Sequence, residues 1–282
     1  MSVSNDGKSM AASLSELREK DHDRFLTLFF APSAARPALT ALYAFNLEIA
    51  RIPELVTEPM MGHIRLQWWR EVLEGLPQGE TRGHAAAVAL HEAGNVPLDR
   101  LQTLIDARER DLSDEPFPDM AALEAYADET SSELMRVAAF ILGGAEKEAA
   151  SEKALYHAGI AYALTGILRA LPVHASQGRM LLPGDIILER NIDPHDVFAG
   201  KLTDGLTLAI GEIAARALEH LASAREAQFD KAILPALLPA TFCERYLDLM
   251  TAPGFDPFKV PVEVPAFQRQ LRLMGRSLAH RF

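Results

Sequence analysis

The sequence holds a single cysteine, Cys243, among its 282 residues. A lone cysteine excludes any disulfide within the chain, and it fits a reducing compartment. It stands among Phe242, Tyr246 and Leu247, so we interpret it as a buried thiol of the core rather than a nucleophile.

Long apolar runs are also missing. A membrane-spanning helix needs about 18 or more consecutive apolar residues, and the nearest stretch, residues 158–168, ends at Arg169. The first 19 residues lack the apolar segment of a secretory signal. We therefore expect a cytoplasmic protein, and we leave peripheral contact with the inner membrane as an open alternative.

Positively charged residues are fewer than negatively charged ones. The sequence has 28 Lys and Arg residues and 39 Asp and Glu residues, which gives a net charge of −11. That balance argues against a nucleic-acid groove, so we expect no nucleic-acid partner. One local exception lies on a predicted helix near the end of the chain. We interpret it as a solvated helix face, with an acidic partner or an anionic membrane as the alternative. Its members are Arg269, Arg272, Arg276, His280 and Arg281.

Alternating runs rich in Val, Ile and Thr, which are typical of strands, are almost absent. Ala- and Leu-rich stretches with helical spacing predict an all-α, single-domain protein over residues 13–282, preceded by a disordered tail at residues 1–12. Two long helices are predicted over residues 119–142, ended by Gly143 and Gly144, and residues 146–171, ended by Pro172. Residues 173–193 form the longest predicted irregular stretch.

Six short strings occur in a fixed order along the chain, at residues 42–45, 65–70, 107–112, 126–127, 164–169 and 178–183. Together they resemble the squalene/phytoene synthase superfamily, over about residues 23–250. The resemblance implies a helical bundle of the isoprenoid synthase type. It also implies that active relatives join two prenyl diphosphates head to head, using Mg²⁺ held by two aspartate-rich motifs to neutralise the departing diphosphate.

The motif positions have lost their aspartates in this chain. The first motif falls on Ala50, Arg51 and Glu54, so one carboxylate remains and a cation stands at a metal position. The second falls on Gly166, Ala170 and His174, where no carboxylate remains. We therefore predict no catalytic residue, no metal ligand and no cofactor, with Mg²⁺ required only if the chain is an enzyme after all.

Several residues that match the family are candidates for binding an anion or another ligand, namely Tyr43, Arg169 and Arg179. Arg51 could join them, but internal ion pairing with Glu48 or Glu54 is the alternative that we favour. For His174, an anion-binding or pH-sensitive role competes with a local hydrogen bond in a loop.

Other acids could in principle replace the missing metal ligands. Glu124 and Asp128 stand one helical turn apart, a spacing at which two carboxylates share a face. Such pairs are common on solvated helix surfaces, and we favour that interpretation.

Within the superfamily, the strings at residues 44–48, 106–112 and 165–185 resemble the branch of mitochondrial respiratory complex I assembly factors. The resemblance implies a non-catalytic bacterial counterpart that assists assembly of complex I. Its partners would be complex I subunits or assembly intermediates, or a lipid or isoprenoid ligand. Two alternatives stay open: a head-to-head prenyl transferase with an atypical metal site, and a lipid-binding protein without turnover.

Overall fold

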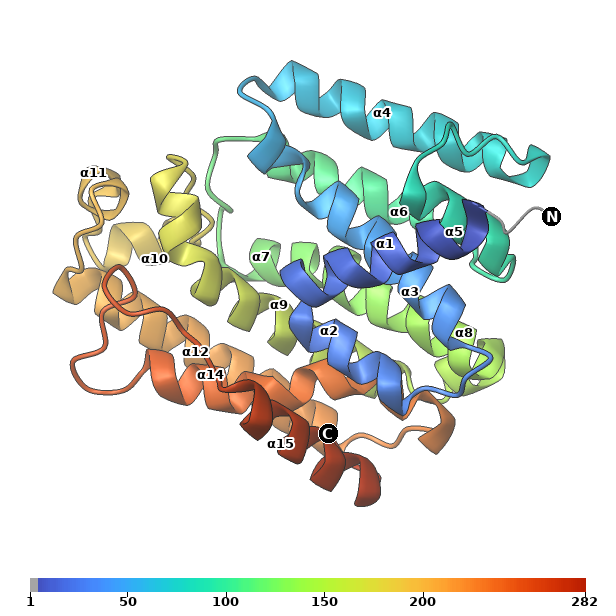
Figure 1. Ribbon diagram of the computed structural model, residues 1–282. Coiled ribbons are helices and arrows are strands. Elements are labelled where there is room, and N and C mark those ends of the chain that lie inside the picture. The colour runs from blue at the N-terminus through green and yellow to red at the C-terminus, as the bar shows by residue number, and fades with distance from the viewer. Residues whose placement is uncertain (1–4) are drawn as a thin grey trace. The chain divides into compact units, whose positions relative to one another are not determined.

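The computed structural model describes residues 5–282, with side chains from residue 8 onward, and every regular element in that range is a helix (Figure 1). The β-type pairing among these residues is limited to an isolated parallel bridge between Phe117 and Pro183. The predicted all-α class is therefore confirmed. None of the described helices is long and apolar enough to cross a bilayer.

The chain divides into two compact units, each made from separate stretches of sequence. The first comprises the described residues up to Ser113 together with Glu133–Ala150 and Phe229–Leu238. The second comprises Asp114–Ser132, Ser151–Gln228 and Pro239–Phe282.

The first unit is built around α3, whose residues Ala41, Leu42, Phe45 and Ile49 are fully buried. Helices α1 and α5 pack against it and against each other. The helices of this unit are α1 (Asn5–Lys20), α2 (His22–Thr27), α3 (Arg36–Ala50), α4 (Pro59–Gly75), α5 (Ala85–Ala93), α6 (Leu98–Arg108), α8 (Glu133–Ala149) and α13 (Leu234–Leu237). Short 3₁₀ turns join them at Leu28–Phe30 (η1), Ile52–Leu55 (η2), Leu76–Gln78 (η3), Glu109–Leu112 (η4) and Lys231–Ile233 (η6).

An arginine of α6 binds two carboxylates of α8 in this unit. Arg100 donates hydrogen bonds to Glu133 at 2.6 Å and to Glu148 at 2.7 Å. Both carboxylates are only 15% exposed, and Glu133 also lies 3.6 Å from Arg136, so two arginines compensate two largely buried charges. By contrast, Arg70 of α4 binds Asp106 and Glu109, whose side chains are well exposed.

The second unit is organised by its two longest helices, α9 and α12, which pack side by side. Thr203 caps the start of α12 by accepting a hydrogen bond from the backbone N–H of Leu206 at 3.2 Å. The helices of this unit are α7 (Met120–Ala127), α9 (Glu152–Ser176), α10 (Gly184–Glu189), α11 (Pro194–Phe198), α12 (Asp204–Glu226), α14 (Cys243–Met250) and α15 (Ala266–Leu278). A π turn, η5, covers Asp128–Ser132, and the 3₁₀ turn η7 covers Leu238–Phe242.

Two glycines of α9 differ in their surroundings. A Cβ added at Gly159 would lie 2.3 Å from the Cα of Ser132 in η5, whereas a Cβ at Gly166 would meet no atom within 4 Å. The close approach at Gly159 is accompanied by a 2.8 Å hydrogen bond from the hydroxyl of Ser132 to the carbonyl of Tyr156. Only glycine fits at position 159 without displacing η5.

The predicted tail differs from the structure. Residues 5–12 are helical, as the first half of α1, while residues 1–4 lie outside the described part of the chain. Helix formation is cooperative, and Ala11 and Ala12 are strong helix formers. They continue a helix that is held in place by buried Ser13 and Leu17.

The helix predicted over residues 119–142 is interrupted, because α7 ends at Ala127 and η5 separates it from α8. The hydroxyl of Thr130 donates to the carbonyl of Tyr126 at 2.7 Å, which competes with regular helical bonding. Within α8, Gly144 is non-helical with φ of 78°, so a break does occur at the predicted glycine pair.

The predicted stop at Pro172 is wrong, because α9 continues to Ser176 with Pro172 inside it. Proline removes one backbone hydrogen bond from a helix interior. The last turn is nevertheless kept, since Leu171 and Ala175 are buried there and their burial offsets part of that loss. Cys243 is buried, as predicted.

Candidate functional site

The first group of predicted site residues lies in the first unit, at the end of α3. Tyr43 and Ala50 are two turns apart on that helix, a spacing that places them on one face. Arg51 is the residue that caps α3, and Glu54 follows in η2. Ala50, Arg51 and Glu54 thus lie together at the end of α3 and the start of η2, and Tyr43 lies at the middle of α3.

Arg51 is held by two carboxylates. Its Nη1 donates to Glu16 of α1 at 3.0 Å, and its Nε lies 3.8 Å from Glu54. The ion pair with Glu54 was one of those predicted from the sequence. The stronger partner, Glu16, was not predicted, because it lies 35 residues earlier in the chain. The guanidinium therefore braces α1 against the end of α3.

Glu48 stands one turn before Arg51 and has an unusual charge environment. Burial raises the pKa of its carboxyl, the nearby carboxylate of Glu16 raises it further, and Arg51 opposes both. His84, which caps α5, places its Nε2 3.7 Å from Glu48. Burial lowers the pKa of His84, while the charge of Glu16 acts in the opposite direction. Burial therefore disfavours the charged form of both side chains in this corner.

A pocket of about 440 Å³ opens beside Glu48 in the first unit. Its polar lining residues are Glu48, Arg65 and His84, and its walls are largely aromatic and aliphatic, with Trp68 and Trp69 of α4 among them. The two tryptophan rings meet edge to face at 5.1 Å between centroids. Volume and lining are those of a site for a small amphiphilic ligand.

Tyr43 is buried on α3, and burial raises the pKa of its phenol to about 12. The guanidinium of Arg24 lies 5.8 Å from its ring centroid and lowers that pKa, while Asp21 raises it. Arg24 is itself bonded to Asp21 at 2.7 Å. At neutral pH, Tyr43 is therefore a protonated hydrogen-bond donor beside an already paired cation.

The second group lies in the second unit, along α9. Gly166, Ala170 and His174 are spaced by four residues and so share one face of that helix, and Arg169 lies three residues after Gly166. The guanidinium of Arg169 stacks 3.8 Å from the ring centroid of Tyr246 in α14, an arrangement that orients the cation. After α9 ends, the backbone N–H of Arg179 donates to the carbonyl of His174 at 2.9 Å, so the turn brings these two residues together.

The residues at the motif positions do not fit a magnesium ion. Mg²⁺ takes oxygen ligands in near-octahedral geometry. The first group supplies one carboxylate, Glu54, which lies next to Arg51, and the second supplies none. Across the described side chains, no group of three or more His, Cys, Asp or Glu is arranged to hold a metal ion.

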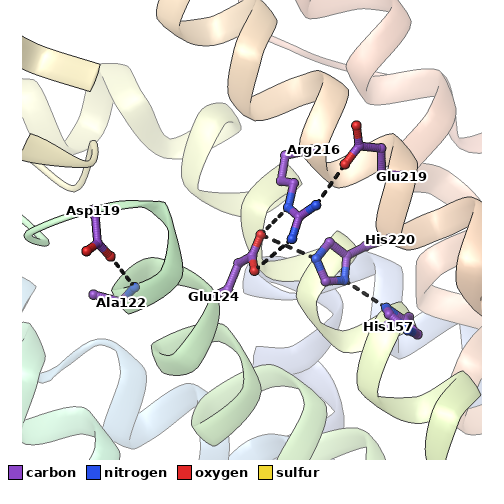
Figure 2. A network of polar contacts seen from close by, with 7 residues as sticks. All are labelled: Asp119, Ala122, Glu124, His157, Arg216, Glu219 and His220. Atoms are coloured by element: carbon purple, nitrogen blue, oxygen red, sulfur yellow. Dashed lines mark hydrogen bonds and ion pairs between the residues drawn. The ribbon is translucent and has the colours of Figure 1, made fainter. Parts of the chain in front are cut away.

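Figure 2 shows a polar network of the second unit that sequence reasoning missed. Glu124 of α7 accepts two hydrogen bonds from Arg216 of α12, one of them from Nη2 at 3.1 Å. Arg216 also donates to Glu219 at 2.8 Å, and the Nε2 of His220 lies 3.4 Å from Glu124. Glu124 therefore faces α12 rather than solvent, and neither interpretation made from the sequence describes it.

Two histidines extend this network. Nδ1 of His220 lies 3.0 Å from Nδ1 of His157 in α9, so one ring donates and the other accepts. Burial lowers the pKa of both imidazoles, and their mutual repulsion adds to the lowering at His157. Burial alone would raise the pKa of Glu124, but the hydrogen bonds and charge of Arg216 hold it below its ordinary value. Near neutral pH the network contains an ionised carboxylate, an arginine and two neutral imidazoles.

Comparison with known proteins extends these observations. A profile of the squalene/phytoene synthase family matches residues 17–275. The chain is 30% identical over 269 residues to NADH dehydrogenase (ubiquinone) complex I, assembly factor 6 of Bos taurus, covering 93% of this chain and 78% of the relative. It is 28% identical over 266 residues to presqualene diphosphate synthase of Sinorhizobium fredii, covering 90% and 92% of the two chains.

Among solved structures, a dehydrosqualene synthase in complex with ligand superimposes with a TM-score of 0.79 at 15% identity, covering 96% of this chain and 95% of that chain. At that identity the likeness concerns the fold alone. It confirms that the helices are arranged as in the isoprenoid synthases.

Proposed function

Since this chain belongs to the squalene/phytoene synthase family, we propose that it is a non-catalytic member that assists the assembly of respiratory complex I by binding a protein or a lipid. The observation that carries the proposal is Arg51. It stands where the family resemblance calls for a metal-binding carboxylate, and it is committed to an ion pair with Glu16.

Electrostatic repulsion is the physical reason why Arg51 disfavours a metal ion at this position. At an effective dielectric constant of about 20, two unit charges about 4 Å apart interact with about 4 kcal/mol. A divalent cation beside Arg51 would meet about twice that repulsion, and the carboxylates of Glu16 and Glu54 are already paired with the guanidinium. Without the metal, a departing diphosphate loses the neutralisation that lowers its barrier.

The assembly role is supported by similarity. The bovine relative carries the name of a complex I assembly factor, and the aligned region spans almost the whole of this chain. The proposed partners are complex I subunits or assembly intermediates. A lipid or isoprenoid is a second kind of ligand, for which Tyr43, Arg169 and Arg179 remain the candidate contacts. We place the action in the bacterial cytoplasm, at the inner membrane, and without a cofactor.

The alternative is a prenyl transferase with an atypical metal site, which the similarity to presqualene diphosphate synthase favours. A direct assay separates the two. The purified chain is incubated with prenyl diphosphates and Mg²⁺, and pyrophosphate release is measured beside an active dehydrosqualene synthase. We expect no release above background. Mg²⁺-dependent release that disappears in the Glu54→Ala variant would establish the enzyme instead.

The assembly role is tested in cells that lack this chain. We expect reduced complex I activity, restored equally by the original chain, by Glu54→Ala and by Glu58→Ala. Glu58 is the matched control, because it is an exposed glutamate four residues further along, at the start of α4. Full complex I activity in the deleted strain would contradict the assembly role. Restoration by Glu58→Ala but not by Glu54→Ala would show that the remaining motif carboxylate is needed.

A further inference from the structure

Helix α15 turns its apolar side chains outward. Phe267, Leu271, Met274 and Leu278 are 69%, 51%, 52% and 81% exposed. Their spacing of four, three and four residues places them in one stripe along the helix. We call these four residues the α15 stripe.

The opposite face of α15 fastens it to the second unit. Leu273 is its one buried side chain, and Arg272 donates to Glu244 of α14 at 2.6 Å. Arg225 of α12 reaches the same carboxylate at 3.3 Å and the carbonyl of Phe282 at 3.1 Å. Leu273 and these polar contacts hold the inner face, and the α15 stripe lies on the opposite, exposed side of the helix.

This end of the chain is also the place where positive charge collects. Residues 265–282 contain four arginines and one histidine but no Asp or Glu, in a chain whose net charge is −11. Glu244 of α14 is an acid that the described structure brings to this cluster. Burial lowers the pKa of Arg276, as do the neighbouring charges of Arg225, Arg272 and Arg281, against the opposing effect of Glu244. Within residues 265–282 the cations therefore outnumber the anions.

We propose that α15 is the surface by which this protein attaches to an anionic phospholipid bilayer, with the α15 stripe inserted among the acyl chains and the arginines drawn to the headgroups. A helix with an apolar stripe, an arginine-rich polar face and no acid has the composition of helices that lie in the bilayer interface. The proposal does not depend on the role in complex I assembly.

A bilayer fits better than other occupants. A second copy of this chain would bring a second acid-free, arginine-bearing helix against the first, and like charges would repel. An acidic protein would be attracted by the arginines, but these lie on the face away from the stripe. A charged bilayer acts on both faces, since its potential extends over about 10 Å at moderate salt, and α15 is itself about 10 Å across.

The test is flotation of the full chain with vesicles of phosphatidylcholine alone or of phosphatidylcholine mixed with phosphatidylglycerol. We expect binding to the anionic vesicles, which weakens with added salt, and little binding to the neutral ones. Leu278→Gln should weaken the binding about tenfold, because a leucine that leaves the acyl layer loses a large part of its transfer free energy. Leu188→Gln is the matched control: Leu188 is 79% exposed, lies on α10, and should not alter binding.

A second arm tests the charge. Arg281→Gln should weaken binding to the anionic vesicles about fivefold, the effect of one cation near such a surface, and should not change binding to neutral ones. Arg18→Gln, at an exposed arginine of α1, is its control. The proposal is overturned if the chain binds neither kind of vesicle, if it binds both equally, or if Leu278→Gln and Leu188→Gln behave alike. A dimer in solution that Leu278→Gln dissociates would assign the α15 stripe to self-association instead.

Discussion

A close backbone approach in the second unit lies at Gly159 of α9, and a single methyl group tests it. In Gly159→Ala the new Cβ would lie 2.3 Å from the Cα of Ser132 and 2.5 Å from its backbone nitrogen, distances that real Cβ atoms essentially never show. The obstacle is backbone, so rotation of a side chain cannot relieve it. Helix α9 and η5 must move apart instead.

The expected loss follows from three contributions. Overpacking of this kind costs up to about 3 kcal/mol, and stretching the 2.8 Å hydrogen bond from Ser132 to Tyr156 removes about 1 kcal/mol more. Alanine improves helix propensity over glycine by about 1 kcal/mol. The free energy of unfolding should therefore fall by about 3 kcal/mol, as measured by urea unfolding followed by circular dichroism.

The control lies seven residues further along the same helix. Gly166→Ala gains the same helix propensity, but its Cβ meets no atom within 4 Å. It should therefore raise the free energy of unfolding by about 0.5–1 kcal/mol. The two substitutions are chemically identical and should have opposite signs. If Gly159→Ala is neutral or stabilising, the close packing of α9 on η5 described above is incorrect.

The remaining predictions concern charge and burial. Arg100→Ala should lower the free energy of unfolding by about 3 kcal/mol, because it removes a hydrogen-bonded cation from two largely buried glutamates, of which Glu133 keeps an ion pair with Arg136 at 3.6 Å. Arg70→Ala should lower it by less than about 1 kcal/mol, since the partners of Arg70 are well exposed. Equal losses in urea unfolding would refute this contrast. Burial lowers the pKa of His157 and His220 in the folded state, so the unfolded chain takes up protons first. The free energy of unfolding should therefore be highest above about pH 6.5 and should decline as the pH falls below that value. A variant with both His157→Asn and His220→Asn should show a shallower decline of its melting temperature between about pH 7 and pH 5.5. Cys243 should react with a thiol reagent only after unfolding, because it is buried in the native state; rapid reaction of the folded chain would contradict its position.

Local sequence patterns predicted the features that depend on neighbours along the chain. Helical periodicity gave the all-α class, and the break at Gly144 follows from a glycine that readily adopts positive φ. The ion pair between Arg51 and Glu54 spans three residues and could be anticipated from helical spacing. The helix end predicted at Pro172 is wrong because it considers only local sequence. The proline does cost a backbone hydrogen bond, but the helix continues because Ala175 is buried in the next turn, and that burial depends on distant parts of the chain.

Contacts between distant segments could not be predicted from local sequence patterns. Arg216 reaches Glu124 across 92 residues, and His220 reaches His157 across 63. In the sequence, Glu124 is simply an acid one turn from another acid, which is a common pattern on exposed helices. Its burial against α12 could be found only once the helices were placed in space.

The contacts of Arg51 show that the position predicted for the first motif holds a paired cation. The guanidinium joins α1 to the end of α3 through Glu16 and also lies near Glu54. It lowers the pKa of Glu48, which burial and Glu16 both raise. An aspartate at position 51 would remove that cation and add a fourth acid beside Glu16, Glu48 and Glu54, so like-charge repulsion and desolvation would act together. An aspartate at this position would therefore also remove the ion pair that links α1 to the end of α3.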